Sequence, residues 1–243
     1  MAQPTIRAMK AGLIAAGLGG RLHRGGLTMP KPLVPVAGRV LMDYVLGAAT
    51  AAGVSQIACI INEQSRGIEE HCRCHWPQIE FEFVRRTTPS SMESLFALRP
   101  LLDRERFLLL TVDAVFAPMV LREFLHAAGS YMAADGVLAL SAFVDDEKPL
   151  RTRIAPDGRI TALGADAEES ALVTAGFYVF EPVIFSEIPA ARLAGFTALR
   201  QFLGHLLREG YRLYGERIAK TVDVDRPEDI AAAEAFVRSG FRE

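Results

Sequence analysis

The chain has 243 residues, of which 50% are hydrophobic and 23% are charged, and its formal net charge is −2. This near-neutral balance argues against a general binder of nucleic acid or of anionic membranes, because such proteins normally carry an excess of positive charge. The first ten residues are too polar for the apolar centre of a secretory signal, and no apolar run reaches the length of a membrane span. We therefore expect a cytoplasmic protein without a disulfide framework, since it has only three cysteines. A homo-oligomer stays open.

Short apolar runs alternate with amphipathic stretches from the start of the chain. Six runs predict buried strands: Lys10–Ala15, Gln56–Asn62, Glu80–Arg85, Arg106–Val112, Gly136–Phe143 and Leu172–Phe180. Six amphipathic stretches predict helices: Leu41–Ala52, Gln64–Cys74, Met92–Leu101, Met119–Ala128, Ala198–Glu209 and Pro227–Arg238. Because helices separate strands that show no apolar–polar alternation, the pattern indicates an α/β fold with a mainly parallel sheet flanked by helices.

The second half of the chain shifts toward mixed strands. Two shorter segments, Arg151–Ala155 and Arg159–Leu163, flank the tripeptide Pro156-Asp157-Gly158. This tripeptide is typical of a tight turn, so the segments predict a β-hairpin. No linker or internal repeat divides the sequence, and we expect one domain, residues 1–243, with a smaller inserted β-rich portion.

A glycine-rich turn follows the first predicted strand. Gly17, Gly19 and Gly20 let the backbone turn tightly and leave amide N–H groups uncovered. Arg21 comes directly afterwards, and Lys31 stands between two prolines ten residues later. Uncovered amides beside two cations predict a site for a polyphosphate.

Two familiar phosphate-binding patterns do not fit this turn. The P-loop pattern requires a lysine followed by Ser or Thr, whereas Lys31 is followed by Pro32. The dinucleotide pattern G-x-G-x-x-G starts at Gly17 but has Leu22 at its third glycine position. A third pattern remains, G-x-G-x-R followed about ten residues later by P-K-P-L-x-P-V-x-G.

This third pattern resembles the nucleotidyltransferases of the nucleotide-diphospho-sugar transferase superfamily. The residues that carry the resemblance read AAGLGGRL at 15–22, PKPLVPVAG at 30–38, TVD at 111–113, TAGFYVF at 174–180 and VDVDRPED at 222–229. They span nearly the whole chain in the order that the superfamily has. The resemblance implies the superfamily's Rossmann-like fold and an enzyme that makes activated sugars or alcohols, as in nucleotide sugar biosynthesis or in cytidylyltransferases.

The resemblance also assigns a nucleotide-binding set. Its members lie in the glycine-rich turn and in a segment that resembles the superfamily's nucleobase contact: Ala15, Ala16, Gly17, Gly19, Gly20, Arg21, Ser90, Ser91 and Ser94. Ser90 and Glu93 also form a capping-box pattern at the start of a predicted helix. The two interpretations of Ser90 are compatible.

Three aspartates are candidates for a metal site. Asp113 follows an apolar run that predicts a central strand, and the carboxyl ends of such strands are where open α/β sheets bind ligands. Triphosphate chemistry usually uses Mg²⁺ held by few carboxylates. Asp223 and Asp225 alternate along an extended segment and so face one side. The pattern D-x-x-E makes Asp225 an N-cap candidate, and the resemblance assigns the second metal position to Asp223, with Asp225 as a further participant.

The acceptor site carries a weaker pattern. Sugar-specific members of the superfamily usually have a Glu-Lys-Pro element before the second β portion, and Lys148-Pro149 comes too early to match it. The resemblance places Gly176 where members pack the acceptor against bare backbone. Arg153 and Lys220 are candidate partners of the acceptor's phosphate, and solvated surface roles fit each of them equally well.

We therefore expect transfer of a nucleoside monophosphate from an NTP to a phosphorylated acceptor, with release of pyrophosphate. Arg21 and Lys31 are the candidate catalytic residues: Arg21 would hold the β- and γ-phosphates, and Lys31 would bridge the α-phosphate and the acceptor's phosphate. Residues 8–135 would form the nucleotide-binding half and residues 136–243 the acceptor-binding half. CTP with inositol or choline phosphate, and UTP, GTP or dTTP with a sugar 1-phosphate, all stay open.

Two other functions also stay open. A glycosyltransferase that uses a ready-made nucleotide sugar shares the implied fold, but such enzymes typically have a D-x-D pair, whereas Val115 stands two residues after Asp113. A catalytically inactive nucleotide-binding regulator is the other alternative. The presence of both cations and of the aspartates argues against it.

Overall fold

The computed structural model describes residues 9–17, 19–143 and 149–242, except for the side chains of Arg21, His23 and Arg66. Lys148, which the sequence analysis compared with the Glu-Lys-Pro element, lies outside these residues. The proposed phosphate contact of the Arg21 side chain also lies outside what is described. None of the described helices is long and apolar enough to cross a membrane.

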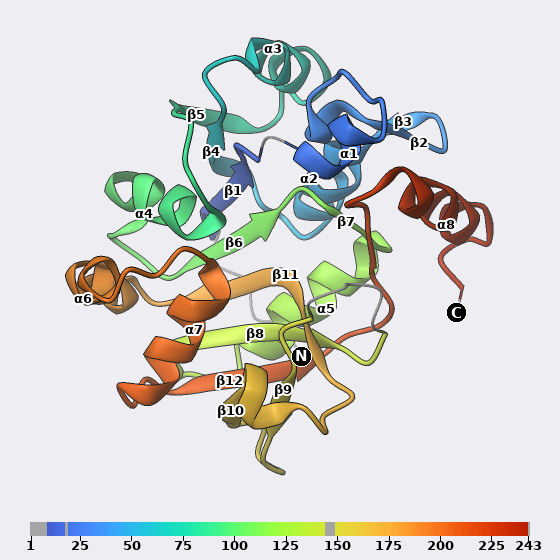
Figure 1. Cartoon of the computed structure of the whole chain (residues 1–243). Coiled ribbons are helices and arrows are strands. Elements are labelled where there is room, and N and C mark those ends of the chain that lie inside the picture. The colour runs from blue at the N-terminus through green and yellow to red at the C-terminus, as the bar shows by residue number, and fades with distance from the viewer. Residues whose placement is uncertain (1–8, 18, 144–148, 243) are drawn as a thin grey trace, which may run out of the picture.

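The centre of the fold is a seven-stranded sheet in the order β12-β8-β11-β6-β1-β4-β5 (Figure 1). Its strands are β1 (Ala11–Ala15), β4 (Gln56–Ile61), β5 (Glu80–Arg85), β6 (Phe107–Thr111), β8 (Gly136–Ser141), β11 (Val173–Phe180) and β12 (Leu213–Arg217). In this sheet β11 runs antiparallel to β6 and β8, and the other pairings are parallel. All six predicted strands are confirmed, and β12 is an addition.

Helices cover both faces of this sheet because its central strands are apolar on both sides. One face packs against α2 (Leu41–Ala51), α3 (Arg66–His75) and α5 (Pro118–Ala128). The other face packs against α4 (Ser91–Leu102), α6 (Ile188–Leu193) and α7 (Leu199–Arg208). In β1, for example, Leu13 belongs to the first apolar core and Ile14 to the second. The predicted α/β fold class is confirmed.

Shorter elements surround the sheet. The predicted hairpin is confirmed as β9 (Thr152–Ile154) and β10 (Ile160–Leu163), and Gly158 in its turn has a φ of 83°. A glycine is suited to this backbone conformation. The remaining pairs are β2 (Pro35–Val36) with β3 (Arg39–Val40) and β7 (Ala114–Val115) with β13 (Val222–Asp223).

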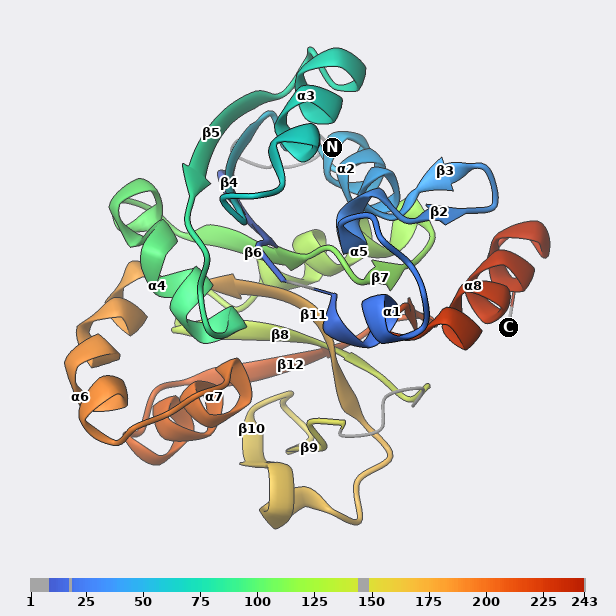
Figure 2. The same ribbon diagram turned by 45° about the horizontal axis from the view of Figure 1, so that its top comes forward.

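The last helix packs against two of the short strands outside the central sheet. The helix α8 (Pro227–Arg238) packs against β2 and β13, and it lies far from α6 and α7 in both views (Figures 1 and 2). A separate apolar core joins Phe236 of α8 to Tyr44 of α2 and Val115 of β7. The short helix α1 (Gly20–Arg24) and the 3-10 helices at Lys31–Leu33, Gly164–Ala167 and Pro182–Glu187 complete the described elements. Helix α8 thereby anchors the segment that carries Asp223 and Asp225.

Replacing Phe107 tests the packing on the second face. Its ring is 1% exposed and stacks on Phe185 with 5.4 Å between centroids. Phe107→Ala removes this contact and leaves a cavity, so we expect the free energy of unfolding to fall by about 3–5 kcal/mol in urea denaturation. Val183→Ala, at a 48% exposed position, is the control and should change stability by less than about 0.5 kcal/mol. A loss below about 1 kcal/mol for Phe107→Ala would contradict the packing described here.

Candidate active site

The candidate site lies where the loops after β1 and β6 diverge. Strand β1 pairs with β4 on one side and with β6 on the other, so the chain leaves β1 at a switch point of the sheet. The glycine-rich turn follows β1. Gly19 has a φ of 59°, and a Cβ built on it would lie 3.1 Å from the Cβ of Lys31. Glycine at this position therefore allows Lys31 to pack directly against the turn.

Lys31 is the central cation of the site. It is 8% exposed, and its Nζ lies 2.5 Å from Oδ1 of Asp225 and 3.4 Å from Oδ2 of Asp113. The lysine begins a 3-10 turn directly after Pro30, which fixes the backbone on which it stands. Two carboxylates from distant parts of the chain thus hold a nearly buried ammonium group.

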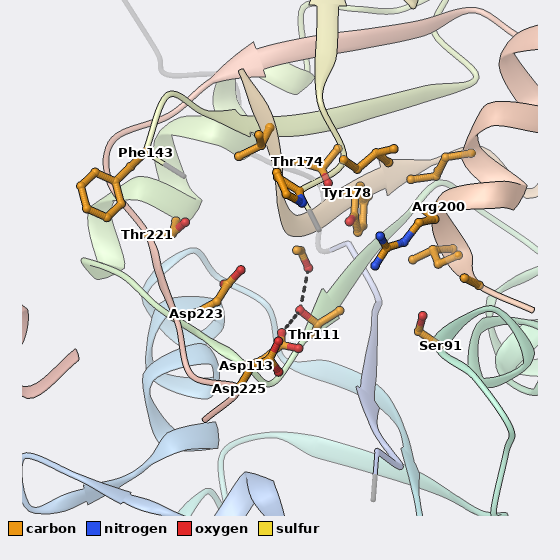
Figure 3. A pocket seen from close by; sticks show the side chains of 17 residues that line it. Ser91, Thr111, Asp113, Phe143, Thr174, Tyr178, Arg200, Thr221, Asp223 and Asp225 are labelled. Atoms are coloured by element: carbon orange, nitrogen blue, oxygen red, sulfur yellow. Dashed lines mark hydrogen bonds between the residues drawn. The ribbon is translucent and has the colours of Figure 1, made fainter. Parts of the chain in front are cut away.

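A short ladder brings these carboxylates together. Asp113 follows β6 and directly precedes β7, and Asp223 pairs with Ala114 across the β7–β13 ladder. The backbone N–H of Val224 donates to the carbonyl of Asp113 over 2.8 Å. Asp223 and Asp225, which alternate on the extended segment, therefore lie beside Asp113 (Figure 3).

The N-cap role predicted for Asp225 is wrong. Helix α8 has Arg226 at its N-cap, and the carboxylate of Asp229 accepts from the N–H groups of Asp225 and Arg226 at 2.9 and 2.7 Å. The Asp225 side chain instead pairs with Lys31. The local D-x-x-E pattern could not reveal this partner, which lies 194 residues away in the chain.

The charges in this cluster reinforce one another. Burial acts to lower the pKa of Lys31, but the negative charges of Asp113 and Asp225 outweigh it and raise the pKa above its ordinary value. Burial likewise acts to raise the pKa of Asp113, but Lys31 and the hydroxyl of Thr111 lower it below its ordinary value. Both groups are therefore charged at neutral pH, as an electrostatic site for phosphates requires.

Thr111 and Gly176 form the next layer. The Thr111 hydroxyl donates to the carboxylate of Asp113 and lies 3.2 Å from the carbonyl oxygen of Gly176. Gly176 has a φ of 79°, in the left-handed region that favours glycine. Strand β11 therefore passes close to Thr111 and to the carboxylate of Asp113.

Two cavities meet at this cluster. The first, about 370 Å³ in volume, is lined by the glycine-rich turn and the start of α4. It includes most of the predicted nucleotide-binding residues: Ala16, Gly17, Gly19, Gly20, Ser90, Ser91 and Ser94. Ala15 is buried within β1 and does not line it. Lys31 lines this first cavity, which we call the glycine cavity.

The second cavity, about 240 Å³ in volume, lies on the β11 side (Figure 3). Both cavities are lined by Ser91, Thr111, Asp113 and Asp225, so they adjoin there. We call Asp113, Asp223 and Asp225 the acidic cluster. Gly176 and Asp223 line the second cavity, as does Arg200, which the sequence analysis missed. We call it the acidic cavity.

The two predicted acceptor cations have contacts of their own. The guanidinium of Arg153 donates to the backbone oxygen of Asp166 over 2.5 Å, and Arg153 lines a different surface hollow. The Nζ of Lys220 lies 3.7 Å from the ring centroid of Phe143. Neither is among the residues that line the acidic cavity, although Phe143 is.

Two serines of the glycine cavity also have structural partners. Ser90 is the N-cap of α4, and its hydroxyl accepts from the N–H of Glu93 over 3.3 Å, which confirms the predicted capping. The Ser94 hydroxyl is buried and lies 2.6 Å from that of Thr88. These contacts fix the start of α4 where it borders the cavity.

Asp113 and Asp223 are the candidate ligands of a divalent ion. In the described part of the chain, no group of three His, Cys, Asp or Glu side chains could hold an ion alone. Mg²⁺ commonly takes only one or two carboxylates together with waters and phosphate oxygens. Asp113 supplies such a carboxylate to both cavities and Asp223 supplies one to the acidic cavity, whereas Asp225 pairs most closely with Lys31.

Gly176→Ala should destabilise the protein more than Gly195→Ala. Both glycines have positive φ, 79° and 68°, so each substitution incurs backbone strain of about 1–2 kcal/mol. A Cβ at position 176 would also lie 2.6 Å from the hydroxyl oxygen of Thr111, whereas no described atom lies within 4 Å of one at position 195. Urea denaturation of the two variants measures the difference. Equal losses of stability would show that Gly176 is not packed against Thr111.

Comparison with known proteins places this geometry in a family. Residues 11–210 match the MobA-like NTP transferase domain. The chain is 29% identical over 219 residues to "CMP-5'-(3-aminopropyl)phosphonate synthase" of Streptomyces rubellomurinus, covering 80% of this chain and 33% of that protein. It is 25% identical over 236 residues to "Bifunctional IPC transferase and DIPP synthase" of Rubrobacter xylanophilus, covering 93% of this chain and 51% of that protein. The chain thus spans a third to a half of the length of these relatives.

A solved structure shows the same fold. The inositol-1-phosphate CTP transferase from T. maritima superimposes with a TM-score of 0.82 at 20% identity, covering 98% of this chain and 99% of that chain. The predicted resemblance to nucleotidyltransferases, and the fold that it implied, are confirmed. The protein belongs to the MobA-like NTP transferase domain family.

Proposed function

We propose that this protein transfers a nucleoside monophosphate from an NTP to a phosphorylated small acceptor and releases pyrophosphate. The observation that carries the proposal is the position of Lys31, which lines the glycine cavity and pairs with Asp113 and Asp225, two carboxylates that line both cavities. A cation in this position is placed to contact the NTP and the acceptor's phosphate where they meet. The family assignment and the names of the relatives agree with such a reaction.

We assign the NTP to the glycine cavity and the acceptor to the acidic cavity. The glycine cavity has uncovered backbone at Gly17, Gly19 and Gly20, which suits a polyphosphate. With the exception of Asp225, its lining comes from residues 14–113. Most of the lining of the acidic cavity comes from residues 143–225. This division supports the nucleotide-binding and acceptor-binding halves proposed from the sequence.

The chemistry is a displacement at phosphorus. An oxygen of the acceptor's phosphate forms a bond to the α-phosphorus of the NTP, and the bond from that phosphorus to the pyrophosphate oxygen breaks. A phosphate monoester is already ionised near neutral pH, so the step requires no general base. Lys31 would hold the α-phosphate and the acceptor's phosphate together, and Arg21 would bind the β- and γ-phosphates. Catalysis then rests on positioning and on charge stabilisation.

Magnesium is part of this proposal. Asp113 and Asp223 would hold the ion, with Asp225 contributing mainly through Lys31. When bound, Mg²⁺ neutralises charge on the phosphates. Thr111 would keep the carboxylate of Asp113 oriented through its hydroxyl group.

Cytidylyl transfer to an alcohol phosphate or phosphonate is the version that the relatives favour. The names of two of them specify CMP or CTP. The Glu-Lys-Pro of this chain, at residues 147–149, comes earlier in the sequence than the corresponding element of sugar-specific members. UTP, GTP or dTTP with a sugar 1-phosphate form the second arm of the test.

A pyrophosphate-release screen tests the function. Four NTPs would be combined with glucose 1-phosphate, inositol 1-phosphate and choline phosphate in the presence of Mg²⁺, and we expect release with CTP and an alcohol phosphate. In a parallel assay with a nucleotide sugar, consumption of that sugar without use of NTP would instead identify a glycosyltransferase. Nucleotide binding without turnover of any pair would identify a regulator.

Lys31→Ala should lower turnover by at least ~100-fold, because the variant loses a major electrostatic stabiliser of the transition state. Lys10→Ala is the matched control. Lys10 pairs with Glu82 over 2.5 Å at the opposite end of β1, and we expect near wild-type turnover from its variant. Circular dichroism should show that both variants are folded. Turnover of Lys31→Ala within a few-fold of wild type would exclude the proposed role.

A further inference from the structure

We propose that Arg200 binds the phosphorus oxyanion of the acceptor, and this inference rests on the proposed function. The chemistry that Arg200 would recognise is shared by phosphate monoesters and phosphonates: a tetrahedral phosphorus group with two or three terminal oxygens. Arg200 would hold oxygens of this group that do not attack the NTP. It would thereby determine which acceptors enter the acidic cavity.

The position of Arg200 is the first argument. It lies in the first turn of α7 and lines the acidic cavity together with Tyr178 and Ser91. Figure 3 shows its guanidinium group pointing into the cavity from the side opposite Asp113 and Asp223. An acceptor in the cavity would therefore lie between Arg200 and the acidic cluster.

The charge of the cavity is the second argument. The acidic side chains in its lining are Asp113, Asp223 and Asp225, and Arg200 is the cationic residue among the described lining. A dianionic acceptor beside these three carboxylates would be strongly repelled unless cations offset their charge. Lys31 already lies between two of these carboxylates at the junction. An acceptor that carries a phosphate or phosphonate group needs a cation on its other side, and Arg200 is placed to provide it.

The geometry of arginine is the third argument. A guanidinium group presents several N–H donors in one plane and can donate two of them to two oxygens of a phosphate. The start of a helix also carries a partial positive charge, which disfavours a basic side chain and favours a bound anion. The first turn of α7 has no acidic residue. An anion held by Arg200 would offset this local repulsion.

The sequence offered two other cations for this role, Arg153 and Lys220. Neither lines the acidic cavity as described. Arg200 therefore replaces both as the expected partner of the acceptor's phosphorus group.

Kinetics of Arg200→Gln, with the acceptor that gives the fastest pyrophosphate release in the screen, tests the inference. We expect the KM for the acceptor to rise at least ~10-fold, since a charge-assisted pair of hydrogen bonds is lost. The KM for the NTP should change by less than about twofold, because Arg200 does not line the glycine cavity. Arg200→Lys keeps the charge but not the planar group, so its KM for the acceptor should fall between wild type and Arg200→Gln.

Arg208→Gln is the matched control. Arg208 lies in the last turn of the same helix, is exposed, and does not line the acidic cavity. Its variant should retain the wild-type KM for both substrates. Thermal unfolding followed by circular dichroism shows that the three variants are folded, and a folded Arg200→Lys keeps the test valid if Arg200→Gln is unstable.

A second arm separates the two sources of the oxyanion. A phosphate monoester and the corresponding phosphonate should lose affinity by similar factors in Arg200→Gln. If wild type releases pyrophosphate and Arg200→Gln has an unchanged KM for both acceptors, the inference is wrong and the proposed function stands. If wild type releases none with any pair, both are wrong.

Discussion

The ion-pair cluster of Lys31, Asp113 and Asp225 is the constraint on which the site depends. The charge of Lys31, a residue that is only 8% exposed, would be costly to bury without a partner, and the two carboxylates offset that cost. The cluster joins three distant segments: the 3-10 turn after Pro30, the link between β6 and β7, and the link between β13 and α8. The β7–β13 ladder and helix α8 hold the last of these in place. The surrounding fold therefore holds the Lys31 ammonium group in the glycine cavity, beside the two carboxylates that line both cavities.

Most of the regular fold was predictable because its elements are long and strongly patterned. The apolar runs of β1, β4 and β6 are buried on both faces, and this pattern indicates central parallel strands. The Pro-Asp-Gly turn predicted the β9–β10 hairpin. The strand β12, with the sequence LYGER, has little apolar character and lies at the sheet edge, so it was missed. The two-residue strands β7 and β13 are too short to carry a periodicity, and pairing across the fold creates them.

Some residues of the site could be predicted from the neighbouring sequence, and others only from the tertiary structure. The sequence alone indicated the glycine-rich turn, Lys31 and Asp113. Forming the neighbouring strands and helices requires neither the uncovered glycine backbone nor these two charged side chains. Asp225 was assigned a helix cap because a local pattern competes with an ion pair that only the tertiary structure forms. Arg200 lies inside an amphipathic helix, where a charged residue on the exposed face is ordinary. The one unusual feature of its sequence position is that a basic residue stands in the first turn of a helix, where basic side chains are disfavoured. Its place in the acidic cavity depends on how α7 packs against the sheet.

The central claim is that the glycine-rich turn and Lys31 bind a triphosphate. A crystal structure with Mg²⁺ and a non-hydrolysable CTP analogue tests it most directly. We predict that the phosphates lie against the backbone of residues 17–20, with the Lys31 ammonium group contacting the α-phosphate. A nucleotide bound elsewhere in the protein, with that turn empty, would contradict the account.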